Sequence, residues 1–193
     1  MSFALIRPTR CRSIPATTER VAAAANIAII RRTFGVHPRN PLQMYFADGK
    51  RLTYDGAKTM AATAIAAARE AGIAIAVAVA DAGGHLIVLE RMDGGKFHTV
   101  HSATTKAVCA SSTKRPTSAR GAQGQDLDVA HALGLALAAG AERWTAMEGG
   151  CPVIVDGECI GGIGVSGGDW ATDERIARAA VESIGASWRT DAK

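Results

Sequence analysis

The clearest pattern along the chain is a helical spacing of apolar residues between Thr53 and Gly72. Apolar residues three and four positions apart share one face of a helix, Thr is a favourable N-cap, and Gly is a favourable stop. The same spacing predicts further helices at about 99–112, 126–139 and 172–186. The expected inward faces comprise Ala57, Met60, Ala61, Ala64, Ile65 and Ala68 in the first helix, and Ile176, Ala179, Ala180 and Ile184 in the last, which Thr172 caps.

Two pairs of apolar runs of strand length lie between these helices. Ile73–Ala80 and His85–Met92 are separated by the turn Asp81–Gly84, and Pro152–Val165 is interrupted by Asp156-Gly157. Asp-Gly between apolar runs is a strong signal for a hairpin, in which the two strands are antiparallel. The order helix, hairpin, helices, hairpin, helix therefore predicts an α+β fold with a central antiparallel sheet flanked by helices.

The first 41 residues have a different character from the rest. We expect a basic tail, a helix at 17–34 with Val21, Ala25 and Ile29 on its apolar face, and the linker His37–Pro41. Residues 42–193 then form the main domain. The Arg-rich, acid-poor start is a feature of cleaved targeting segments, but we favour a flexible tail.

Composition and charge argue against nucleic acid and membranes as partners. The net charge is only +4, and no nucleic-acid recognition motif accompanies the basic tail, so we expect no nucleic-acid partner. No apolar run approaches the roughly 18 residues of a membrane span, so we expect no membrane partner and a cytoplasmic protein. The four cysteines lack C-x-x-C spacing, and Cys151 and Cys159, which flank a turn, are expected to be reduced.

The stretch Ile160–Gly168 satisfies two catalytic or cofactor motifs at once. It contains the dinucleotide fingerprint G-x-G-x-x-G and the nucleophile elbow G-x-S-x-G, whose serine would be Ser166. The fingerprint belongs to a βαβ unit, whereas a hairpin precedes it here, and the elbow needs a later histidine, whereas none follows Ser166. We therefore interpret the stretch as a core strand whose glycines let another backbone, or a ligand, approach closely.

Several sequence blocks occur together and in order. They are Ala78–Leu86, Arg91–Gly94, Lys106, Arg115–Thr117, Gly149–Gly157 and Ile160–Gly167. In these blocks the chain, from about Leu52 to Ala186, resembles the GlcG/HbpS-like family, also called the haem-degrading-domain family. The resemblance implies a profilin-like fold and assembly into homo-oligomers, from dimers to octamers.

The function that this resemblance implies is broad. Some members resemble secreted haem binders that sense redox state, and others are fused to corrinoid adenosyltransferases, accompany glycolate oxidation or lie in operons for the catabolism of aromatic compounds. No single catalytic set is shared, so the fold does not fix the activity. The basic N-terminal extension and the lack of a secretion signal weaken the extracellular haem-sensor interpretation.

Three histidines are candidate metal ligands. His98 and His101 lie three residues apart at the start of a predicted helix, and His85 lies on the preceding strand. Three imidazoles suit a zinc or iron site, and one suits an axial haem position. The start of a helix also favours anions, so a carboxylate ligand is an equally open interpretation, and plain solvated histidines are a third.

Lys106 and Glu148 are the candidate proton-transfer residues, together with His98. Lys106 would pair with a ligand carboxylate or act as a base; its alternative is a salt bridge to Asp81 or Asp93. Glu148 would act as an acid or base, with a solvated loop carboxylate as the alternative. The residues expected to contact a ligand are Arg91, His101, Arg115, Gly150, Gly164 and Ser166.

Three functional hypotheses follow. The first is a small-molecule binding protein whose ligand is a tetrapyrrole or a carboxylated metabolite. The alternative is an enzyme without an organic cofactor (a tautomerase, hydratase, hydrolase or dehalogenase) that acts on an unsaturated carboxylate such as an aromatic ring-cleavage product. The sequence does not identify a cofactor. A role in assembly, with the N-terminal helix as a clamp between subunits, is a third hypothesis.

Overall fold

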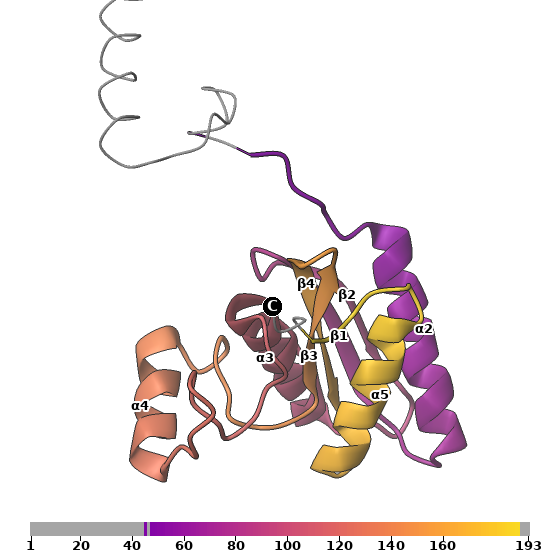
Figure 1. Cartoon of the computed structure of the whole chain (residues 1–193). Coiled ribbons are helices and arrows are strands. Elements are labelled where there is room, and N and C mark those ends of the chain that lie inside the picture. The colour runs from indigo at the N-terminus through magenta and orange to yellow at the C-terminus, as the bar shows by residue number, and fades with distance from the viewer. Residues whose placement is uncertain (1–44, 46, 190–193) are drawn as a thin grey trace, which may run out of the picture. The chain divides into compact units, whose positions relative to one another are not determined.

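A four-stranded antiparallel sheet with helices on both faces organises the computed structural model (Figure 1). The structure describes residue 45 and residues 47–189. The predicted basic tail and the predicted helix at 17–34 lie outside the described residues. Among the described residues, no helix is both long enough and apolar enough to cross a membrane.

The order of elements confirms the α+β prediction. They are α2 (Tyr54–Glu70), β1 (Ala76–Asp81), β2 (Leu86–Arg91), α3 (Phe97–Thr113), α4 (Val129–Ala139), β3 (Gly150–Val155), β4 (Glu158–Ser166) and α5 (Trp170–Glu182). The strands lie in the order β2-β1-β4-β3, so the two hairpins join through β1 and β4. Every neighbouring pair is antiparallel.

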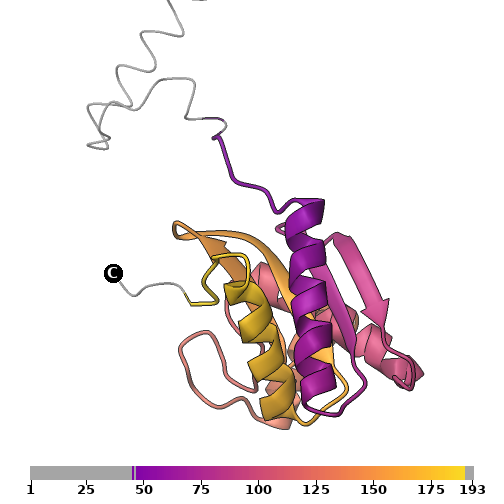
Figure 2. The ribbon, with the colours of Figure 1, turned by 90° about the vertical axis from the view of Figure 1, so that its right-hand side faces the viewer.

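The two faces of the sheet are covered by different helices. Figure 2 shows α2 and α5 side by side on one face, and α3 lies on the other. Strand β1 reads Ala-Val-Ala-Val-Ala, and its residues point alternately to the two faces. Val77 and Val79 enter the larger core under α2 and α5, whereas its alanines pack against Ala103 and Ala107 of α3. Alanine on this second face lets α3 approach the sheet closely.

The ends of α2 agree with the prediction, and those of α5 do not. Thr53 caps α2 by accepting a hydrogen bond from the backbone N–H of Gly56. In α5 the cap is Asp169, not Thr172: Asp169 Oδ1 accepts from the backbone N–H of Thr172 at 2.9 Å. Ala179, predicted to face inward, is exposed, because the buried face of α5 is instead Asp173, Ile176, Ala177, Ala180 and Val181.

Helix α4 is unusual because it is apolar yet contributes no buried residue. It projects from the domain on the side of α3 (Figure 1). Its large exposed side chains are Val129, Leu133, Leu135 and Leu137, with exposed fractions of 84%, 57%, 43% and 73%. Helices that are apolar around their circumference are normally buried, so α4 presents a surface suited to a partner.

Candidate functional site

Lys106 lies in a buried ion pair and not at the surface of a cleft. Its Nζ donates to Asp173 Oδ2 at 3.0 Å and to the backbone carbonyl oxygen of Val165 at 2.8 Å. Both charged side chains are about 95% buried, with exposed fractions of 5% and 4%. The predicted partners Asp81 and Asp93 are therefore wrong. With both hydrogen bonds directed into the protein, Lys106 is poorly placed to bind a ligand carboxylate or to act as a base.

The ion pair and the backbone of Lys106 account for two glycines, Gly149 just before β3 and Gly150 as its first residue. A Cβ atom added to Gly149 would lie 2.8 Å from Asp173 Cβ and 2.9 Å from Lys106 Nζ, and the φ angle of Gly149 is +103°. A Cβ on Gly150 would lie 2.6 Å from the carbonyl oxygen of Lys106. The structure thus brings together Lys106, Gly149 and Gly150, but around a carboxylate of the protein itself.

Gly164, predicted to border a ligand cleft, lies against the backbone of α3. A Cβ there would lie 2.0 Å from the carbonyl oxygen of Ala103, and one on Gly162 would lie 2.3 Å from that of Ala107. No side chain fits in that space, so these glycines permit close packing of a helix on the sheet. Of the two interpretations of the glycine-rich stretch, close approach of another backbone is the one that the structure supports.

Most of the length of α3 separates His85 from His98 and His101. His98 and His101 are exposed at the start of that helix, whereas His85 lines a cavity with Val108, Cys109 and Thr113 near its end. A rise of 1.5 Å per residue puts the two ends of α3 roughly 20 Å apart. Among the described residues no group of three His, Cys, Asp or Glu side chains could hold a metal ion, so the predicted three-imidazole site is wrong.

The cavity beside His85 is the best candidate for a ligand site. It has a volume of about 480 Å³, within the range of small-molecule sites. The turn between β1 and β2, the last turns of α3 and the segment after α4 enclose it. Its lining residues are Ala82, Gly83, Gly84, His85, Val108, Cys109, Ser111, Ser112, Thr113, Ala139, Arg143 and Trp144.

Asp81 fixes the orientation of the His85 imidazole. Its Oδ1 accepts hydrogen bonds from the backbone N–H groups of Gly83 at 2.8 Å and His85 at 2.9 Å, and lies 3.2 Å from His85 Nδ1. Desolvation raises the pKa of Asp81, but these hydrogen bonds together outweigh it and hold the pKa below its usual value. An ionised carboxylate on Nδ1 leaves Nε2 as the lone-pair nitrogen, as in carboxylate–histidine–metal arrangements.

The glycine of this turn has a specific steric role. A Cβ atom on Gly83 would lie 2.9 Å from both Nδ1 and Cε1 of His85. Glycine at this position therefore lets the imidazole lie against the turn and reach Asp81. The side chain of His85 is 83% exposed, so the ring is accessible to a ligand at the rim of the cavity.

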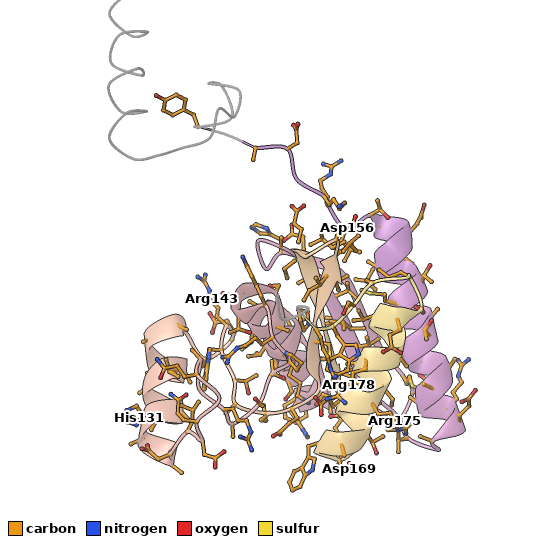
Figure 3. The ribbon with its side chains drawn as sticks, in the orientation of Figure 1. His131, Arg143, Asp156, Asp169, Arg175 and Arg178 are labelled. Carbon is orange, nitrogen blue, oxygen red and sulfur yellow. The ribbon has the colours of Figure 1, made fainter. Side chains whose placement is uncertain are left out.

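Arg143 and Trp144 are site residues that the sequence reasoning missed. They follow α4 and line the same cavity as His85, and Figure 3 labels Arg143. The sequence did contain one signal for these two residues. An arginine next to a tryptophan in a loop is more typical of recognition than of packing. Their position against the end of α3 depends on long-range packing, which local pattern does not specify.

The cysteines are poor candidates for nucleophiles. Burial raises the pKa of the Cys109 thiol, whose Sγ lies 3.7 Å from the carbonyl oxygen of Thr145. Burial also raises the pKa of Cys151, to about 12. Cys109, Cys151 and Cys159 are free thiols, and in the sheet Cys159 pairs with Ile154, so Cys151 and Cys159 are not opposite each other.

The remaining predicted residues are distributed around the domain. Arg91 is exposed at the end of β2, and Glu148 is half-buried before β3. Ser166 is buried at the end of β4, opposite Ala76. Arg115 Nη1 donates to the carbonyl oxygen of Gly121 at 2.7 Å, which orders the segment after α3. None of these four lines the cavity beside His85.

A larger cavity, of about 540 Å³, lies on the other side of the same turn. It shares Ala82 and Gly83 with the His85 cavity, and its other lining residues are Lys50–Tyr54, Asp81, Ile87 and Ile160. Although it is larger, it has no histidine, and the Asp81 carboxylate in its lining is held by the hydrogen bonds of the turn. The His85 cavity therefore has the stronger chemical case.

Comparison with known proteins agrees with the fold. The family model described as "Haem degrading protein HbpS-like" matches residues 52–182. Protein GlcG of Escherichia coli strain K12 is 37% identical over 111 residues, which cover 55% of this chain and 78% of GlcG.

Two solved structures have similar folds. The PduOC–haem complex superposes with a TM-score of 0.63 at 25% identity, covering 72% of this chain and 99% of the other. A double mutant of HbpS from Streptomyces reticuli superposes with a TM-score of 0.60 at 31% identity, covering 78% of this chain and 96% of the other.

Proposed function

This chain belongs to the HbpS-like family, and we propose that it is a small-molecule binding protein whose ligand is haem, bound in the cavity beside His85. One observation carries the proposal: a carboxylate-oriented imidazole, Asp81–His85, stands at the rim of a cavity of about 480 Å³. The similarity to a protein solved as a haem complex supports the choice of ligand class.

The residues of the cavity suit the chemical parts of haem. Haem would supply an iron that a neutral imidazole nitrogen can ligate. His85 provides that nitrogen, and Asp81 keeps Nδ1 occupied so that Nε2 carries the lone pair. Trp144 provides an aromatic surface for a macrocycle, and the Arg143 guanidinium provides donors for a propionate carboxylate. Thus one ligand can satisfy the apolar, aromatic and cationic parts of the lining together.

A titration of the full chain with haemin tests the proposal. Absorbance in the Soret region should shift and saturate at one haem per chain. A response that rises without saturation, as for haemin adsorbed to many surface sites, would contradict it.

We further propose that the chain self-associates through α4, with a second copy of the same chain as the partner. The apolar surface of α4 carries His131 and no Lys, Arg, Asp or Glu within the helix, so two copies can meet without burying opposed charges. Small alanine side chains flank the leucines, which allows close helix contact. A symmetric interface needs such a self-complementary surface.

A further inference from the structure

A third cavity, distinct from those at the β1–β2 turn, has a strongly cationic lining. It has a volume of about 430 Å³ and lies between α5, the segment after α3, and the residues after α5. Its five cationic lining residues are Lys114, Arg115, Arg120, Arg178 and Arg189. Glu174 is the one carboxylate among the lining residues. This composition favours an anionic ligand.

Backbone carbonyl groups fix two of these guanidinium groups. Arg115 Nη1 donates to the carbonyl oxygen of Gly121 at 2.7 Å, and Arg120 Nη1 donates to that of Gly124 at 3.1 Å. A guanidinium has five N–H donors, so each side chain retains donors after this single bond. Both groups are thereby ordered before any ligand binds, which lowers the entropic cost of binding.

Trp188 orders two more guanidinium groups, those of Arg178 and Arg189. The guanidinium carbons of Arg178 and Arg189 each lie 4.0 Å from the centre of its ring. The Trp188 Nε1–H donates to Glu182 Oε1 at 2.9 Å, which fixes the ring itself. Stacking on an aromatic face leaves the in-plane N–H groups of a guanidinium free for an oxyanion.

The charges of this cluster are only partly balanced. Arg178 pairs with Glu174, and Arg120 lies 3.6 Å from Asp126. Within the described part of the chain, Lys114 and Arg115 form no ion pair. In addition, Arg178 Nε is buried with no acceptor among the described residues. Excess positive charge and an unpaired buried donor both favour added acceptor groups at this place.

We propose that this cavity binds a small multivalent oxyanion, carrying carboxylate or phosphate groups, on Arg115, Arg120, Arg178 and Arg189. The ligand's anionic groups would accept charge-assisted hydrogen bonds from the ordered guanidinium groups. The site uses no residue of the His85 cavity, so it operates independently of haem binding.

Titration of the full chain with citrate and with pyrophosphate, at constant ionic strength, tests the proposal. Binding is followed by calorimetry and by tryptophan fluorescence, with acetate as the monovalent control. We expect saturable binding of at least one multivalent probe at one site per chain, and none of acetate. Citrate binding identifies a polycarboxylate site, and pyrophosphate binding identifies a phosphate site.

Matched variants separate a built site from general surface charge. Arg120→Gln and Arg189→Gln should each weaken binding by roughly tenfold, because each removes a charge-assisted hydrogen bond. Arg175→Gln, on the same helix as Arg178 but outside the cavity lining, should leave affinity unchanged (Figure 3). His85→Ala should also leave it unchanged. Absence of saturable binding, or equal losses in the Arg175 and Arg120 variants, would overturn the proposal.

Discussion

Lys106, on the helix that covers one face of the sheet, forms a buried ion pair with Asp173, on a helix that covers the other face. The contact passes the end of β4, where Lys106 also binds the carbonyl oxygen of Val165. Asp173 Oδ1 accepts in turn from the backbone N–H of Gly168 at 2.9 Å. One pair of charges thus joins α3, the end of β4 and the start of α5.

Replacing Lys106 with Met should therefore destabilise the protein strongly. The variant leaves the Asp173 carboxylate buried without its cation, and such losses cost about 3–5 kcal/mol. Urea denaturation would measure the change in the free energy of unfolding. The double variant Lys106→Met/Asp173→Asn should lose less than the sum of the two single variants, and strict additivity would argue against the pair.

An exposed pair provides the control for that measurement. Lys50 and Asp156 form a salt bridge at 2.7 Å, but their side chains are 47% and 76% exposed. Exposed pairs contribute little because water screens the charges. Lys50→Met should leave the free energy of unfolding within experimental error of the wild type.

Substituting two glycines with alanine should have opposite effects on stability. Gly164→Ala places a Cβ 2.0 Å from a carbonyl oxygen of α3, so the helix must move, at a cost of about 1–3 kcal/mol or more. Gly134→Ala lies in the exposed α4 with open space around it, and should stabilise by about 0.5–1 kcal/mol. Thermal unfolding of both variants measures this, and a harmless Gly164→Ala would refute close packing of α3.

The sequence predicted the fold well because its signals are local. The Asp156-Gly157 turn, the stripe from Ala57 to Ala68 and the Thr53 cap each depend on neighbours within a few residues, and all three occur as expected. The Val/Ala alternation of β1 was harder to interpret, because both faces are buried and only the size of the side chains differs.

The candidate site was predicted less well because it depends on long-range contacts. The sequence predicts a ligand-binding or catalytic role for Lys106 because it does not show that Asp173 lies beside it. The two residues meet only because their helices pack on opposite faces of the same sheet. The sequence suggests one group of three histidines because residue spacing does not show where His85 lies relative to α3. In the structure, His85 lies near the end of α3, whereas His98 and His101 lie at its start. His85 is among the residues predicted from the sequence, whereas Arg143 and Trp144 become part of its cavity only through the packing of the segment after α4.

Asp81→Asn should weaken haemin binding about tenfold or more, because the residue orients the His85 ligand. Asparagine keeps an acceptor oxygen for the turn but loses the charge that holds Nδ1–H. A matched control exists in Asp128, whose Oδ2 lies 2.9 Å from His131 Nδ1 at the start of α4, away from the cavity. Asp128→Asn should leave haemin affinity unchanged, and equal losses in both variants would contradict the positioning role.

The pH dependence of the Asp81 contribution follows from the direction of its pKa shift. Its pKa is lower in the folded protein than its usual value, because hydrogen bonds from Gly83 and His85 outweigh desolvation. The stabilising effect is therefore complete above the usual carboxyl pKa of about 3.9 and is lost as the pH falls through the lower, folded value. Between pH 8 and 9, above the ordinary titration ranges of Asp carboxyl and His imidazole groups, the free-energy difference between wild type and Asp81→Asn should be constant in denaturation experiments.

Charges introduced on α4 should prevent self-association. Leu133→Glu and Leu137→Glu place carboxylates on the exposed apolar surface, and a second copy could bury them only at high cost. Light scattering should show the mass of an oligomer for the wild type and of a monomer for these variants. Met147→Glu, at an exposed apolar residue outside α4, is the control and should keep the oligomer. A monomeric wild type, or unchanged oligomers in both leucine variants, would contradict the proposal.

Haemin titration of two variants, His85→Ala and His98→Ala, is the sharpest test of whether haem binds at His85. Both histidines are exposed, but only His85 lines the cavity and is oriented by a carboxylate. We expect His85→Ala to lose the saturable Soret shift, and His98→Ala to bind one haem per chain with the affinity of the wild type. An unchanged titration of His85→Ala would contradict the assignment of the site.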